Sequence, residues 1–138
     1  MILSKKGREY VSRERLPERR HTWRQKVRII DEEIGGTHTF YVDFGEYPDG
    51  RLAEIFITSQ KTGTFVRGTL ELLAQTVSLA LQTGTSPLSV AAMLQQQDFS
   101  PQGKVMAEGS SVKECKSVAD YIGQEISACY DETGKRKR

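Results

Sequence analysis

Apolar and polar residues alternate along residues 22–60, which is typical of strands that bury one face. In the first run Trp23, Val27 and Ile29 fall on one face, and three cations occupy the other. The second and third runs alternate in the same way, and a turn sequence separates each run from the next. These turns are Gly35-Gly36 and Pro48-Asp49-Gly50. The pattern predicts an antiparallel meander.

Beyond the third run, the apolar spacing changes to steps of three and four residues, which predicts a long helix that ends near Gly84. Ser86-Pro87 combines an N-cap with proline at the first helical position, and it opens a shorter helix. Residues 104–116 favour a short strand or a hairpin. Ser117 and Asp120 fit a capping box, which begins a C-terminal helix.

These elements predict an α+β fold, in which the antiparallel meander sheet packs against the long central helix, with the short helix and the C-terminal helix beside it. The chain has 138 residues, of which 37% are hydrophobic, so it can bury one core but not two. We expect a domain over residues 22–130, a basic N-terminal arm over 1–21 and a basic C-terminal tail over 131–138.

The net charge of +2 hides a segregation of charge along the chain. Ten of the 20 Lys and Arg lie in residues 1–28, and four more end the chain, whereas 15 of the 18 carboxylates lie in residues 29–134. The basic ends therefore suit an anionic ligand, an acidic face of another subunit, or nucleic acid. They also fit solvated tails.

Several classes of function find no support in the sequence. No apolar stretch is long enough for a membrane span or a signal peptide, so we expect a cytoplasmic protein without a membrane partner. Cys115 and Cys129 lack metal-ligand spacing, and we expect two reduced thiols. His21 and His38 do not form a zinc pair, and no nucleophile motif occurs. We expect no enzymatic activity, no metal and no cofactor.

The segment that precedes the long helix has the composition of an anion site. A helix N-terminus offers unpaired N–H groups and a partial positive charge. Gly63 allows close approach, while hydroxyls and cations flank it. The candidate phosphate ligands are Lys61, Thr62, Gly63, Thr64 and Arg67. The alternative is an ordinary Thr64 N-cap beside exposed cations.

Aromatic residues near this segment are candidates for stacking on a base. Phe65 lies beside the cap, and Phe99 lies in a loop between elements. Tyr41 and Phe56 on the sheet and Trp23 at its start are further candidates, although most aromatics on alternating strands are expected to pack in the core. In a homo-oligomer, cations of a neighbouring subunit would close the site. They are Arg19, Arg20 and Arg28.

Several motifs together resemble the TSCPD domain, which occurs at the C-terminus of adenosylcobalamin-dependent ribonucleotide reductases and in short stand-alone proteins. They are residues 52–57, Gly63-Thr64-Phe65-Val66-Arg67-Gly68, residues 77–84, Phe99-Ser100-Pro101-Gln102-Gly103 and residues 116–122. The Cys and Pro of the naming motif are replaced by Val118 and Ala119, so a redox or metal role for that Cys does not carry over. The reductase's catalytic parts lie outside this domain, and the resemblance argues against enzymatic activity.

The leading hypothesis is a non-catalytic protein that binds and sequesters or senses a nucleotide or cyclic nucleotide. Phage proteins that sequester immune signals, such as the Thoeris anti-defence sponges, supply an analogy. A nucleic-acid-binding accessory protein that uses the basic arms is an alternative. An interaction module that docks on a ribonucleotide reductase is another.

Overall fold

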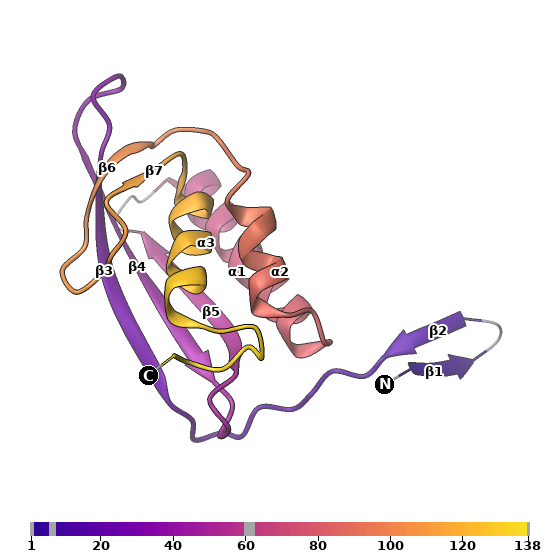
Figure 1. Cartoon of the computed structure of the whole chain (residues 1–138). Coiled ribbons are helices and arrows are strands. Elements are labelled where there is room, and N and C mark those ends of the chain that lie inside the picture. The colour runs from indigo at the N-terminus through magenta and orange to yellow at the C-terminus, as the bar shows by residue number, and fades with distance from the viewer. Residues whose placement is uncertain (1, 6–7, 60–62, 138) are drawn as a thin grey trace.

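The computed structural model describes residues 2–5, 8–59 and 63–137, and its centre is a five-stranded antiparallel sheet (Figure 1). The order of the strands in this sheet is β5-β4-β3-β6-β7. The strands are β3 (Thr22–Ile30), β4 (Thr37–Glu46), β5 (Leu52–Ser59), β6 (Gly103–Met106) and β7 (Glu114–Cys115). The first three form the predicted meander, and β6 with β7 forms the predicted hairpin beside β3. Both predictions are confirmed.

Period-two alternation decides which side of the sheet is buried. Val27, Phe40, Val42 and Ile55 point to the side of the helices and are almost inaccessible to solvent. Trp23, at the start of β3, stacks on Phe44 of β4 with ring centroids 4.3 Å apart. The inner face of the meander is therefore a continuous apolar surface.

In the described residues, three helices lie on this inner side (Figure 1). They are α1 (Thr64–Gln82), α2 (Pro87–Leu94) and α3 (Val118–Cys129). The hydroxyls of Ser86 and Ser117 accept hydrogen bonds from the backbone N–H groups of Ser89 and Asp120, so both predicted caps are confirmed. The predicted α+β class is confirmed as well.

α1 packs against the outer edge of the sheet, whereas α3 contributes more of the core. The Ser78 hydroxyl bonds to both the N–H and the C=O of Ile55, and the Gln82 amide donates to the C=O of Ala53. These contacts satisfy backbone groups of the edge strand β5, which would otherwise be open to pairing. Tyr121 and Ile122 of α3 are fully buried. The predicted packing of the long helix on the sheet is confirmed, and α3 adds a large part of the core.

Close packing of α2 on α3 requires a glycine at position 123. A Cβ there would lie 2.7 Å from the Ala91 carbonyl oxygen and 2.8 Å from the Gln95 Cγ. Gly123→Ala should therefore lower the free energy of unfolding by about 1–3 kcal/mol in urea denaturation. Gly68→Ala is the matched control on α1, where the space is open, and it should raise stability by about 0.5–1 kcal/mol. Equal effects of the two substitutions would contradict the packing argument.

The N-terminal arm contains a hairpin that the sequence did not predict. β1 (Ile2–Lys5) pairs with β2 (Arg8–Val11), and the hairpin lies away from the main sheet (Figure 1). The chain then runs along the domain, where Glu14 pairs with Arg51 at 2.7 Å.

The C-terminal segment also contacts the domain. Residues 131–137 turn back, and the Arg136 guanidinium lies 4.6 Å above the Trp23 ring and 3.7 Å from the Glu46 carboxylate. Cations of the basic ends are thus held by contacts within the chain, among them Arg13, Arg20 and Arg136.

Candidate binding site

An apolar cavity of about 390 Å³ lies where the ends of β4 and β5 meet the start of α1 and the loop before β6. Its volume is in the range of small-ligand sites. Apolar side chains form most of the wall, and they come from five separate segments. The residues that line it are His38, Thr39, Phe40, Ser59, Phe65, Val66, Thr69, Leu70, Phe99, Ser100, Pro101 and Val118.

Phe65 and Phe99, the two aromatics proposed to stack on a ligand, both line this cavity. Phe65 is 83% exposed and Phe99 is 50% exposed, so both rings are accessible. Sequence reasoning missed His38 and Val118, because strand ends and a helix start far apart in the chain give no local signal. That Phe65 and Phe99 bind a ligand stays a prediction.

The loop that carries Phe99 is fixed at both ends. The Phe99 N–H donates to the Lys116 carbonyl, and the Gln102 N–H donates to the buried Asp31 carboxylate at 3.0 Å. The bond from Gln102 lowers the pKa of Asp31, and bonds from the next turn add to this effect. The loop therefore presents Phe99 on a supported backbone.

The first residues of α1 do not form the Thr64 N-cap that was the alternative to an anion site. The N-cap is Gly63, which has no side chain to cap the helix, and Thr64 is the first helical residue. The prediction of a Thr64 N-cap is therefore wrong. Arg67 is exposed and does not line the cavity. Lys61 and Thr62 lie outside the described residues, so the phosphate site stays a prediction.

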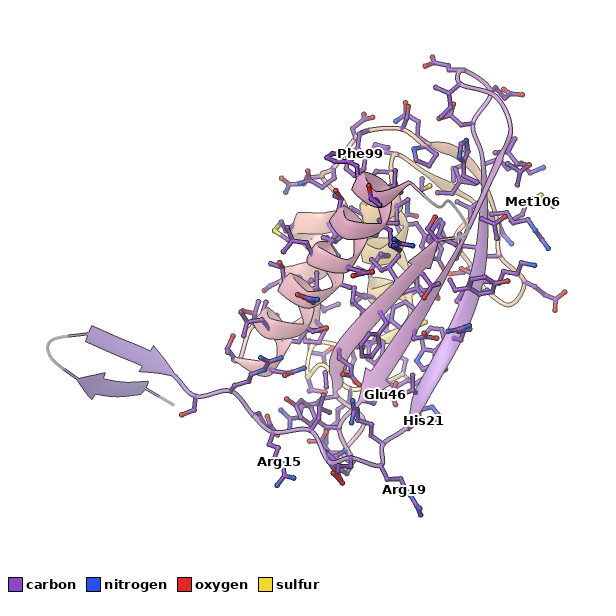
Figure 2. All side chains as sticks on the ribbon, turned by 180° about the vertical axis from the view of Figure 1, so that it is seen from behind. Arg15, Arg19, His21, Glu46, Phe99 and Met106 are labelled. Atoms are coloured by element: carbon purple, nitrogen blue, oxygen red, sulfur yellow. The ribbon has the colours of Figure 1, made fainter. Side chains whose placement is uncertain are left out.

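The arginines proposed to close the site do not reach it within one chain. Figure 2 shows Arg19 at the end of the sheet opposite Phe99. Arg20 is bound to Glu54 at 2.6 Å, and this hydrogen bond raises the pKa of Arg20. Arg28 is exposed on the face of the sheet turned away from the helices. A contribution from a neighbouring subunit stays a prediction.

A second feature adjoins the cavity, and we call it the α1 surface. It consists of Phe65, Val66, Leu72 and Leu79 on α1, together with Phe99. Leu72 is 63% exposed and Leu79 is 48% exposed. Because Phe65, Leu72 and Leu79 recur every seven residues, they fall on one side of the helix. The long helix thus presents an apolar stripe to solvent.

The two thiols and the two histidines lie in different parts of the domain. Burial raises the pKa of Cys115 to about 11 and of Cys129 to about 12, so both thiols are protonated at neutral pH. His21 and His38 lie at opposite ends of the β3–β4 pair. Within the described ranges, no cluster of three His, Cys, Asp or Glu side chains could hold a metal ion. No described helix is both long and apolar enough to cross a membrane.

Comparison with known families matches residues 8–130 to the TSCPD domain. The chain belongs to the TSCPD family. Curated proteins similar to it include the vitamin B12-dependent ribonucleotide reductases of Bradyrhizobium diazoefficiens and Agrobacterium fabrum, at 36% and 35% identity over 118 residues. The reductase of Rhodopirellula baltica is 32% identical over 112 residues. No solved structure matches the chain.

The match covers most of this TSCPD chain and little of its relatives. The Bradyrhizobium alignment spans 86% of this chain and 9% of the reductase, and the Agrobacterium alignment has the same coverage. The Rhodopirellula alignment spans 81% of this chain and 10% of the reductase. The chain therefore corresponds to about a tenth of the length of these enzymes.

The segment that departs from the family's naming motif has a structural role here. Val118 and Ala119 begin α3 and are buried, and Val118 also lines the cavity. Ser117 caps α3, while the Asp120 carboxylate accepts from the Lys116 N–H at 2.7 Å. Capping and packing thus account for these four positions.

Proposed function

We propose that this TSCPD domain is a non-catalytic interaction module that docks on a ribonucleotide reductase or a similar protein through the α1 surface. The observation that carries the proposal is the exposure of Phe65, Leu72 and Leu79 on one side of a 19-residue helix. Large apolar side chains grouped on a surface are typical of protein interaction sites.

The charges of α1 agree with this role. Arg67 and Glu71 are its two charged residues, and the stripe between Leu72 and Leu79 carries none. A solvated helix would carry charges on its outer side. In the reductase relatives a similar segment belongs to a much longer chain, which would bring a surface like this one next to other parts of the same enzyme.

Binding to a purified vitamin B12-dependent ribonucleotide reductase, in full-length form and without its own TSCPD segment, tests the proposal. Leu72→Glu should weaken binding at least 100-fold in biolayer interferometry, because a buried apolar anchor is replaced by a charge. Ala128→Glu, on an exposed position of α3, is the matched control and should bind normally. Equal affinities for both variants, or no binding to either form of the reductase, would reject the proposal.

A second candidate function is nucleotide binding, and the convergence of Phe65 and Phe99 on one cavity favours it. A base would stack between the rings, with the start of α1 near its phosphate. Sequestration of a cyclic nucleotide or ADP-ribose signal by a homo-oligomer is its most specific form. At 100-fold excess over Kd such a ligand should add about 2.7 kcal/mol of stability in a thermal-shift screen. Phe99→Ala should abolish this gain, whereas Leu72→Glu should keep it.

A further inference from the structure

Among the described residues, no helix covers the side of the sheet turned away from α1, α2 and α3, and we call this side the open face (Figure 1). Alternation places every second side chain of each strand on it, opposite the buried Val27, Phe40 and Ile55. Its central residues are Arg24, Lys26, Arg28, Thr39, Tyr41, Asp43, Phe56, Thr58 and Met106. The open face therefore combines cations with aromatic rings.

Two aromatic residues lie side by side on neighbouring strands of the open face. Phe56 is opposite Asp43 and Tyr41 is opposite Thr58, so the two rings are diagonal neighbours. Phe56 departs from the expectation that most aromatics on strands pack in the core, because 49% of this residue is exposed. An exposed phenylalanine on the edge strand β5 provides a platform on which a flat group can stack.

The cations of β3 lie next to these rings. The Arg24 guanidinium and the Lys26 ammonium are 5.2 Å and 5.9 Å from the centre of the Tyr41 ring. Arg24 also binds Asp43 through two bonds, of 2.7 and 3.0 Å. In the part of the chain that the structure describes, none of the ion pairs involves Lys26 or Arg28. The positive charge of these two side chains is therefore available to an anion.

The positive surface has definite ends. Beyond Arg28, Lys104 is opposite Glu114, and Glu32 and Glu33 lie in the adjoining turn, so the surface becomes acidic there. At the other end, Glu54 is neutralised by Arg20. Figure 2 shows Arg15 and Arg19 extending from the arm at that end of the sheet. The cations thus form a track from the arm along β3.

We infer that the open face binds a single-stranded nucleic acid, with bases stacked on Phe56 and Tyr41 and phosphates on Lys26, Arg28 and the arm cations. Charge complementarity selects a polyanion, and the exposed Phe56 ring beside the half-buried Tyr41 selects unpaired bases over a duplex, whose bases are already stacked. Phe56 adjoins the α1 surface, because Phe56 and Leu79 line one pocket between β5 and α1. Lys26 and Arg28 lie on the side of the sheet turned away from the helices.

Fluorescence anisotropy with labelled oligo-dT and oligo-U of about 12 nucleotides tests the inference on the full chain. With about four phosphate contacts, affinity should fall roughly 50-fold between about 50 and 200 mM salt. Phe56→Ala should weaken binding about 5- to 150-fold through the loss of one stacked base. Lys26→Gln combined with Arg28→Gln should lower the slope of log affinity against log salt by about 1.4.

The matched controls lie on the other side of the molecule. Met93→Ala and Ala128→Gln change exposed positions of α2 and α3, and both should leave oligonucleotide affinity unchanged. The inference is overturned by any of three results: no binding up to about 100 μM protein at low salt, equal loss in the controls, or tighter binding to duplex. Capture of a protein by this face without affinity for oligonucleotides would also overturn it. Reductase binding should be unaffected by Lys26→Gln combined with Arg28→Gln, so the two proposals fail separately.

Discussion

Replacing Glu125 by leucine should lower the free energy of unfolding by about 4 kcal/mol, even though leucine is more hydrophobic. The Glu125 carboxylate is buried and accepts hydrogen bonds from the Ser110 hydroxyl, the Tyr121 hydroxyl and the Cys129 thiol. Burial, with Glu125 beside it, raises the pKa of Tyr121, so the tyrosine remains a donor. Without the carboxylate, two buried hydroxyls and the partly buried Cys129 thiol would lose their acceptor.

Urea denaturation followed by circular dichroism measures the effect of this substitution. Glu125→Gln keeps one acceptor oxygen and should cost clearly less than the leucine variant. Glu132→Leu, at an exposed position, should change stability by no more than about 0.5 kcal/mol. If Glu125→Leu were as stable as Glu132→Leu, the buried hydrogen bonds would have no net role in stability.

Those parts of the fold that depend on local pattern could be predicted from the sequence. The alternation around Val27 and Val42 fixes which face of each strand is buried, and Ser86 and Ser117 mark helix starts because a capping hydroxyl acts within three residues. Neither signal depends on a distant partner. The meander and the helix starts were accordingly predicted.

The parts that depend on distant partners could not be predicted. The exposure of Leu72 and Leu79 has no local signal, because it depends on Ser78 and Gln82, which turn another side of α1 to the edge of β5. Phe65 and Phe99 were identified individually, whereas the cavity that joins them also needs His38. Sequence pattern identifies an unusual residue, but only the packing of segments shows which residues share a site.

A methyl group at position 103 should cause a loss of stability of about 3 kcal/mol or more. Gly103 has φ +134, and a Cβ there would overlap the Ile30 carbonyl oxygen on the neighbouring strand. Because a backbone atom cannot swing aside as a side chain can, Gly103→Ala must displace β6 from β3. The same shift would move Gln102 from Asp31, which holds the loop of Phe99.

Gly36→Ala separates backbone strain from this overlap. Gly36 has φ +83 and open space around it, so the substitution should cost only about 1 kcal/mol, from the left-handed conformation itself. Thermal and urea unfolding of both variants measure the difference. A larger loss for Gly103→Ala than for Gly36→Ala, together with weaker ligand or partner binding near Phe99, would mean that the β3–β6 contact positions the cavity. Equal losses of stability would mean that backbone strain is the sole cause. The contact of Gly103 with Ile30 would then have no role in positioning the cavity.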